Sequence, residues 1–254
     1  MKKILAVIGS NRKQTTYYAV REFERVLASC GDIAFDTIFL KDYSLGFCQG
    51  CKQCFDKGEA HCPLHDDRDA LIKKLKEADG VLLAVPNYAF HVPAQVKNLL
   101  DRLAFMFHRP DFFGKTFLPL VTQGFFGGRA IMRYLATMAA YFGFRVAGGC
   151  VLQGLEPMTD AARVKNSEAI RKAARRFRRK LNQPLRPPSL YRFMMFRMAR
   201  AGVLNLDDSY CDYRYFKEKG WFESDYYYDA RLNPLKKLAG ILFDRLGRRL
   251  MKST

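Results

Sequence analysis

The sequence predicts a doubly wound α/β protein, in which helices cover both faces of a five-stranded parallel sheet and a helical or irregular C-terminal extension follows. Over residues 1–182, five short apolar runs alternate with five helical patterns. The runs are apolar almost throughout rather than at every second residue, which is typical of strands buried on both faces. A helix after each strand favours parallel pairing with right-handed crossovers.

The first predicted strand is Lys3–Gly9. It follows a Met-Lys-Lys start that secretion signals share, but its apolar part ends at Gly9 and no small-residue cleavage site follows. We therefore interpret it as a buried strand of a cytoplasmic protein. The other predicted strands are Ile33–Leu40, Gly80–Val85, Thr116–Thr122 and Arg145–Leu152.

The predicted helices are Thr16–Ser29, Asp67–Glu77, Pro93–Phe107, Arg129–Phe142 and Asp160–Leu181. Three of them have a recognisable start: Asp66 or Asp67 at the second, Pro93 at the third and Thr159 before the fifth. Asp and Thr side chains accept hydrogen bonds from the free amides of a first turn, and proline lacks the amide that would stay unpaired there.

A proline-rich stretch at 184–188 ends this pattern and divides the chain into two predicted parts, residues 1–182 and residues 183–254. The second part is basic and aromatic-rich and ends in an amphipathic helix pattern, Pro234–Met251. We expect it to pack on the first part or on a second subunit. Its final helix either packs its leucines on the protein or lies on an anionic membrane surface.

Composition and charge narrow the class of protein. Almost half of the 254 residues are apolar, which argues against disorder, and no apolar run reaches the roughly 20 residues of a membrane span. The net charge is +18, and residues 171–254 hold 21 Lys and Arg against 8 Asp and Glu. Nucleic acid, anionic lipid or an acidic protein could match this charge, but no recognition motif supports nucleic-acid binding.

The loop after the first strand has the composition of a phosphate site. Ser10, Arg12, Thr15 and Thr16 combine hydroxyls and a guanidinium with the start of a helix, where amides point outward. The loop matches neither the Walker A motif nor the G-x-G-x-x-G motif, which argues against a P-loop NTPase and a dinucleotide-binding domain. The alternative is a polar loop in which Thr15 or Thr16 only caps the helix.

The loops after the third and fourth strands have the composition of a ring-binding site. Tyr88 and Phe90 can form apolar walls, and Asn87 and Gln123 can face a polar ring edge. The carboxyl ends of parallel strands share one edge of the sheet, so we expect these loops to lie beside the first one. The alternative is that the aromatic residues belong to the rim of the core.

Four cysteines crowd into one segment: Cys48, Cys51, Cys54 and Cys62. Three thiolates at Cys-x2-Cys-x2-Cys spacing with a more distant fourth suit a [4Fe–4S] cluster. A cluster-free loop, a zinc site and a redox-active thiol pair remain alternatives.

Taken together, these motifs resemble the NADPH-dependent FMN reductase and iron–sulfur flavoprotein group of the flavodoxin-like superfamily. The resemblance rests on Gly9-Ser10-x-Arg12 with Thr15 and Thr16, the cysteine motif with Asp66-Asp67, Val85-Pro86-Asn87-Tyr88, and Gln95-x-Lys97 followed by Asp101-Arg102. It covers residues 1–182. The chain departs from the family at Lys13 and Gln14, where family members often have Gly, so the phosphate loop can differ in shape.

The resemblance implies strand order 2-1-3-4-5 and bound FMN, whose phosphate would lie on Ser10, Arg12, Thr15 and Thr16. The residues implied around the flavin ring are Pro86, Asn87, Tyr88, Ala89, Phe90, Thr122, Gln123, Gly124 and Gly127. It also implies NAD(P)H as reductant and a homodimer. The predicted function is an FMN-dependent NAD(P)H oxidoreductase that serves a small-molecule or protein acceptor. The alternatives are a [4Fe–4S] electron carrier and a peripheral membrane protein with a flavodoxin fold.

Overall fold

The computed structural model describes residues 1–29 and 31–251, with side chains described up to residue 249. The chain forms two compact units. Unit 1 comprises Met1–Gln49, Leu64–Ala104 and Pro110–Gln183, and unit 2 comprises Gly50–Pro63, Phe105–Arg109 and Pro184–Thr254. The boundary near residue 183 coincides with the proline-rich stretch. Two short segments, Gly50–Pro63 and Phe105–Arg109, were predicted to belong to the first part, but in the structure they group with the C-terminal residues.

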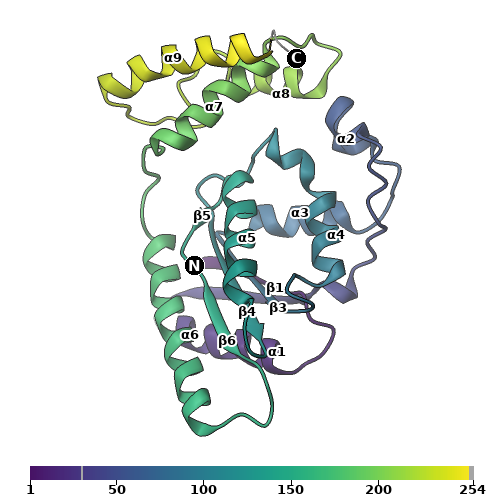
Figure 1. Cartoon of the computed structure of the whole chain (residues 1–254), viewed down its shortest axis with the longest axis vertical. Coiled ribbons are helices and arrows are strands. Elements are labelled where there is room, and N and C mark those ends of the chain that lie inside the picture. Colours follow the sequence, from purple (N-terminus) through teal and green to yellow (C-terminus); the bar gives the residue numbers. More distant parts are fainter. Residues whose placement is uncertain (30, 252–254) are drawn as a thin grey trace. The chain divides into compact units, whose positions relative to one another are not determined.

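Unit 1 is built around a parallel sheet (Figure 1). The strands are β1 (Lys2–Ile8), β2 (Ile33–Phe39), β3 (Gly80–Pro86), β4 (Thr116–Gln123), β5 (Arg145–Val146) and β6 (Cys150–Gln153). Their order is β2-β1-β3-β4-β5, and β6 also pairs with β4. The predicted order 2-1-3-4-5 and the flavodoxin-like fold are confirmed.

The fifth predicted strand, Arg145–Leu152, differs from the structure, where it is divided in two. β5 pairs with the start of β4 at Thr116 and Phe117, whereas β6 pairs with the end of β4 from Leu120 onward. The connecting residues 147–149 include Gly148 at φ 86°, a left-handed backbone conformation that interrupts regular strand pairing. Two short strands therefore share the position that the apolar pattern assigned to one.

Helices cover both faces of this sheet. They are α1 (Thr15–Ala28), α3 (Arg68–Glu77), α4 (Ala94–Arg102), α5 (Gly128–Tyr141) and α6 (Asp160–Leu181). The predicted helix Pro93–Phe107 ends earlier, at Arg102, and a 3-10 turn, η3 (Ala104–Phe107), follows. A second 3-10 turn, η1 (Leu40–Asp42), follows β2. At the start of α6, Thr159 accepts a hydrogen bond from the Ala162 amide, as predicted.

The strands are buried on both sides, as their apolar pattern predicted. Ile4, Ala6 and Ile8 of β1 face a core shared with α1 and α6. Val7 points the other way, toward a second apolar layer formed with α3, α4 and α5. Because successive strand side chains alternate between faces, a strand with apolar residues at nearly every position must be covered twice.

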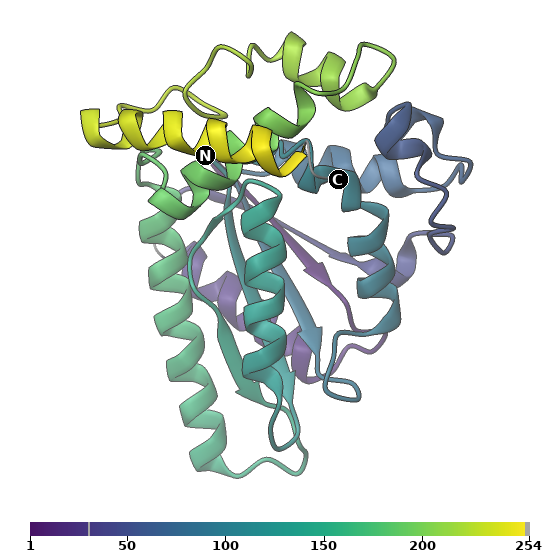
Figure 2. The same cartoon turned by 45° about the horizontal axis from the view of Figure 1, so that its top comes forward.

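Unit 2 is helical. It contains α2 (Gln53–Asp56), the 3-10 turn η2 (Glu59–His61), α7 (Leu190–Val203), α8 (Cys211–Glu218) and α9 (Pro234–Met251). The bounds predicted for the last helix are confirmed, whereas α7 and α8 were expected only as unspecified helices and loops. Helices α7 and α9 pack along each other (Figure 2). Among the described residues, no helix combines the length and the apolar character needed to cross a bilayer.

Candidate binding site at the carboxyl edge of the sheet

The three loops predicted to form a site lie at one edge of unit 1. Strand register aligns Ile8 with Ala84, and Pro86 with Thr122, so β1, β3 and β4 end side by side. The loop after β6 reaches the same edge, because the Gly154 amide donates to the Gln123 carbonyl at 2.7 Å. This fourth loop was not predicted as part of the site. The strand before it, β6, was expected only as the end of the longer strand Arg145–Leu152.

The first loop has the properties of an anion site. Ser10 is buried, and its hydroxyl lies 3.3 Å from the Arg12 amide, which shapes the turn. The Arg12 side chain is exposed and makes no hydrogen bond or ion pair within the described residues. Helix α1 begins at Thr15, and Gln14 before it offers no capping side chain in the described structure. The free amides and positive end of α1 thus face the same loop as a guanidinium.

Thr16 has a different role from the cap that was the alternative. Its hydroxyl lies 2.7 Å from the Thr122 hydroxyl, and both side chains are buried. Thr16 therefore joins the first loop to the end of β4 instead of closing the first turn of α1. Half-buried Thr15, at the first position of the helix, remains the hydroxyl closest in sequence to the free amides.

The loop after β3 is a tight hairpin. Tyr88 and His91 exchange two backbone hydrogen bonds, of 3.0 and 2.9 Å. The two residues between them, Ala89 and Phe90, have φ angles of 48° and 63°. Such angles are usual for Gly or Asn, and for other residues they cost about 1–2 kcal/mol each. This strain holds Phe90 outward at the sheet edge, and strained residues of this kind cluster at binding sites.

Asn87 connects the second and third loops. Its backbone N–H donates to the Thr122 carbonyl at 2.7 Å, and its side-chain nitrogen donates to the Phe126 carbonyl at 2.8 Å. The side-chain oxygen is buried and accepts no hydrogen bond within the described part of the chain. A buried acceptor without a donor is unfavourable by about 1–3 kcal/mol. A ligand that donates a hydrogen bond to this oxygen would remove that penalty.

Gln123, which was predicted to face a ring edge, makes two side-chain hydrogen bonds within its own loop. Its side-chain oxygen accepts from the Gly128 amide at 2.7 Å, and its nitrogen donates to the Phe125 carbonyl at 3.2 Å. Gln123 therefore shapes its own loop and satisfies an amide at the start of α5. In the same loop Gly127 has φ 96°, and a Cβ there would lie 3.0 Å from both Asn87 and Phe90.

Aromatic side chains are exposed on these two loops. The exposed fractions are 45% for Tyr88, 63% for Phe90, 76% for Phe125 and 66% for Phe126. The ring centroids of Phe90 and Phe126 are 5.3 Å apart. Aromatic residues gathered on the surface often mark a binding site, so their exposure favours a binding site over the rim of the core.

Helix α4 supports the first loop and the chain before the cysteine motif. Gln95 donates to the Gly9 carbonyl at 3.3 Å and to the Asn11 side chain at 2.8 Å. Asn98, which is buried, accepts from the Cys48 amide at 3.1 Å and donates to the Leu45 and Gly46 carbonyls. Asn98 was missed by the sequence interpretation, although its position on the buried face of a helix could have signalled a structural amide.

A buried ion pair completes this support. Arg102 donates to both oxygens of Asp66, at 2.6 and 3.0 Å. Burial by itself raises the pKa of the Asp66 carboxyl, but hydrogen bonds from Arg102 and from the Gly46 and Arg68 amides outweigh burial and lower the pKa below its ordinary value. The Asp66 carboxylate is therefore charged at neutral pH and fixes the segment that leads to Cys48.

The four cysteines of the motif do not belong to one unit. Cys48 lies in unit 1, whereas Cys51, Cys54 and Cys62 lie in unit 2. Cys48 and Cys51 are exposed, and the other two are half-buried. In the described residues no group of three or more His, Cys, Asp or Glu side chains is placed to hold one metal ion. The thiolates of a [4Fe–4S] cluster bind separate irons and need a wider arrangement.

Arg109 fixes the cysteine loop inside unit 2. Its guanidinium is 2% exposed and donates to the Cys54 carbonyl at 2.6 Å and to Glu59 at 3.1 Å. It also pairs with Asp212 at the start of α8, and His108 contacts the same carboxylate at 2.6 Å. These long-range pairs were not predicted, because no local pattern indicates which distant residues will meet.

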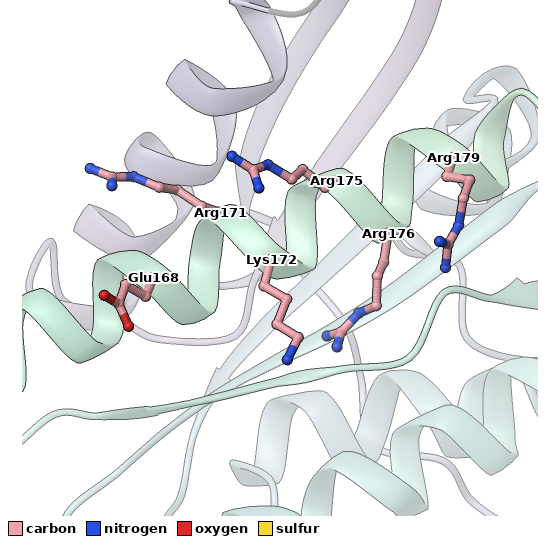
Figure 3. A pocket seen from close by; sticks show the side chains of 6 residues that line it. All are labelled: Glu168, Arg171, Lys172, Arg175, Arg176 and Arg179. Carbon is pink, nitrogen blue, oxygen red and sulfur yellow. The ribbon is translucent and has the colours of Figure 1, made fainter.

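A separate hollow lies along α6 and contains none of the predicted site residues. It is lined by Glu168, Arg171, Lys172, Arg175, Arg176 and Arg179. Figure 3 shows Arg171 and Arg175 on one side of the helix and Lys172 and Arg176 on the other. Arg176 donates to the Gly149 carbonyl at 2.7 Å, which ties α6 to the chain before β6.

The fold and the sheet edge together define a flavodoxin-like α/β protein. Two solved structures share the fold. RosB with bound 8-demethyl-8-formylriboflavin-5′-phosphate has a TM-score of 0.58 at 14% identity and covers 92% of both chains. An NAD(P)H:quinone oxidoreductase from Methanothermobacter marburgensis has a TM-score of 0.55 at 16% identity and covers 68% of this chain and 96% of its own.

The family model for NADPH-dependent FMN reductases matches residues 2–154, and the chain belongs to this family. An iron–sulfur flavoprotein from Methanocaldococcus jannaschii is 42% identical over 101 residues, which cover 39% of this chain and 51% of that protein. One from Archaeoglobus fulgidus is 34% identical over 130 residues, covering 50% and 62%. The chain thus spans about half to three-fifths of the length of these relatives.

Proposed function

We propose that this protein binds FMN at the carboxyl edge of its sheet and acts as an NAD(P)H-dependent oxidoreductase that passes electrons to a small-molecule or protein acceptor. One observation carries the proposal: the uncapped start of α1 with Arg12 lies at the same edge as the exposed aromatic loops and the unpartnered oxygen of Asn87. Membership of the FMN reductase family supports it.

The residues at the edge fit the two ends of FMN. The phosphate would be held by the first-turn amides of α1, by the hydroxyls of Ser10 and Thr15, and by Arg12. The aromatic side chains of Tyr88, Phe90 and Phe126 would lie against the flavin, and Asn87 would accept a hydrogen bond from it. Gly124 leaves open space beside them, since only Leu155 comes within 4.0 Å of a Cβ placed there.

When bound, FMN would supply the redox chemistry, since it accepts hydride and holds electrons without an acid–base pair from the protein. The chain itself would hold the phosphate, orient the ring and exclude water from one side of it. The strained hairpin at Ala89 and Phe90 suits this task, because it presents an aromatic wall before the ligand arrives.

The proposal is tested by an Arg12→Ala variant, with Arg25→Ala at the other end of α1 as the matched control. Loss of a charge-assisted contact to phosphate should weaken FMN binding roughly 10- to 100-fold. The control should bind as the native protein does, because Arg25 lies in the last turn of α1. Fluorescence quenching of FMN measures both. Equal affinities for the two variants, or no FMN binding by the native chain, would refute the proposal.

A second candidate function is electron transfer through FMN and a [4Fe–4S] cluster. It is favoured by the spacing of Cys48, Cys51, Cys54 and Cys62 and by relatives named iron–sulfur flavoproteins. Anaerobic purification followed by iron and sulfide analysis separates the two. Iron and sulfide with broad visible absorption favour the carrier, whereas flavin bands alone favour the oxidoreductase.

We also propose a cytoplasmic location and a homodimer. The cysteines that the structure describes are free thiols, which suits a reducing compartment. The exposed aromatic residues around the proposed flavin site are surface that a second subunit would cover.

A further inference from the structure

Helix α9 carries an apolar face that no described residue of unit 2 covers. The exposed fractions are 77% for Leu235, 66% for Leu238, 50% for Ile241, 64% for Leu242 and 43% for Leu246. Leu250, which continues this face in the sequence, lies outside the described side chains. The apolar face predicted from the sequence therefore exists, but in this structure it does not pack on the rest of the unit.

The opposite face of α9 explains why. Gly240 lies so close to α7 that a Cβ there would be 2.9 Å from the Phe193 ring, and one at Gly247 would be 2.8 Å from the Ala201 Cβ. Between them, Asp244 pairs with Arg197 and Arg200 of α7. Small residues and a buried ion pair fix this contact, so α9 cannot turn its leucines toward α7 without breaking the pair.

Cations lie beside the leucines. The sequence of α9 contains five basic residues and one acid, and that acid is Asp244, which faces α7. Arg245, Arg248 and Arg249 are exposed. At helical spacing, Lys237 and Arg248 lie at the Ile241 border of the leucine face, and Arg245 and Arg249 lie among the leucines. Lys237 pairs with Asp225 of the preceding loop at 3.4 Å, which leaves the three arginines as the cations of the outward part. The part of α9 that faces away from α7 is thus apolar and positively charged, because the one acid of the helix, Asp244, is turned toward α7.

We propose that α9 binds the surface of an anionic lipid bilayer. Its leucines would enter the boundary between headgroups and acyl chains, and its arginines would contact the anionic headgroups. Charge complementarity selects this occupant over a second copy of the chain. Two α9 helices joined at their leucines would bring two sets of arginines together, with both Asp244 carboxylates already engaged. The inference is independent of the proposed flavin chemistry.

The test uses the full chain and vesicles of phosphatidylcholine with or without phosphatidylglycerol. At low salt, we expect co-sedimentation with the phosphatidylglycerol vesicles only. Leu242→Glu should weaken vesicle binding at least about tenfold, since the substitution places a charge on the face that would enter the bilayer. Replacing both Arg248 and Arg249 with Gln should weaken it roughly 30-fold. Val164→Glu, an equally exposed apolar residue on α6, is the matched control and should leave it unchanged.

Several results would overturn the inference. One is that the chain does not co-sediment with phosphatidylglycerol vesicles at low salt. Another is that Leu242→Glu and Val164→Glu weaken vesicle binding equally, and a third is that the chain binds neutral and anionic vesicles equally well. Sedimentation velocity without lipid tests the second-copy occupant, and a dimer that Leu242→Glu dissociates would replace the lipid proposal. Circular dichroism of each variant confirms that folding is retained, which the exposure of these side chains leads us to expect.

Discussion

Helices α6 and α9 are both basic and amphipathic, yet they bury opposite sides. In α6 the apolar side is inside: Ile170 is 2% exposed and Phe177 is fully buried. In α9 Leu238 and Leu242 are 66% and 64% exposed, and the side that packs contains glycines and an aspartate. Apolar residues at helical spacing therefore identify an apolar face, but they do not determine whether that face is covered.

The surface that each helix meets makes the difference. Helix α6 lies on a sheet whose strands present apolar side chains to it. Helix α9 meets α7, which buries Arg197 and Arg200 at 8% exposure each. Two buried guanidinium groups require a carboxylate, and Asp244 is the acid that α9 can offer. The charge requirement of α7 thus overrides the apolar pattern of α9.

The largest expected effect tests the buried apolar side of α6. Phe177→Ala would remove a ring that packs edge-on against Phe23 at 5.6 Å, and it should lower the free energy of unfolding by about 3–5 kcal/mol. Leu242→Ala in α9 is the matched change and should cost about 0.5 kcal/mol or less. Urea denaturation measures both. Similar losses for the two variants would mean that α9 is also covered in solution.

The next effect tests the buried polar side of α9. Asp244→Ala would remove the carboxylate that Arg197 and Arg200 share and leave Arg197 with only the longer contact to Asp225, at 3.5 Å. It should cost about 3 kcal/mol in the stability of unit 2. Glu168→Ala, the exposed acid beside the hollow on α6, should change stability by about 0.5 kcal/mol or less. Thermal unfolding followed by circular dichroism compares the two. A harmless Asp244→Ala variant would break the proposed explanation of how α9 is oriented.

The smallest effect extends the comparison to α4, which also buries a charged side chain. Asp66 has a lowered pKa in the folded protein, so its charge stabilises the fold above the ordinary Asp pKa of 3.8. This contribution is lost as pH falls through the folded pKa. Asp66→Asn should cost about 1.5–3 kcal/mol at neutral pH and flatten the acid limb of a stability curve measured by urea denaturation. Exposed Asp42→Asn should leave that limb unchanged.

Much of the fold and site could be predicted from local sequence. Strand order, the helix α6 and the convergence of three loops followed from repeated strand–helix patterns and from the family resemblance. The division of the fifth strand was not predicted, although the adjacent glycines Gly148 and Gly149 in its middle are a turn signal that could have indicated it. The hydrogen bonds of Gln123 within its own loop were not predicted, because an amide beside a glycine-rich loop can satisfy either a ligand or the loop itself.

The sequence by itself determined the sheet, its edge and the residues gathered there, because strand burial and loop position depend on short-range patterns. The tertiary structure alone decided which residues pair across long distances, such as Asn87 with Phe126, Arg102 with Asp66, and Asp244 with Arg200. It also decided that the leucines of α9 stay outside. Those outcomes depend on which surfaces compete for each side chain, and that competition exists only after the chain has folded.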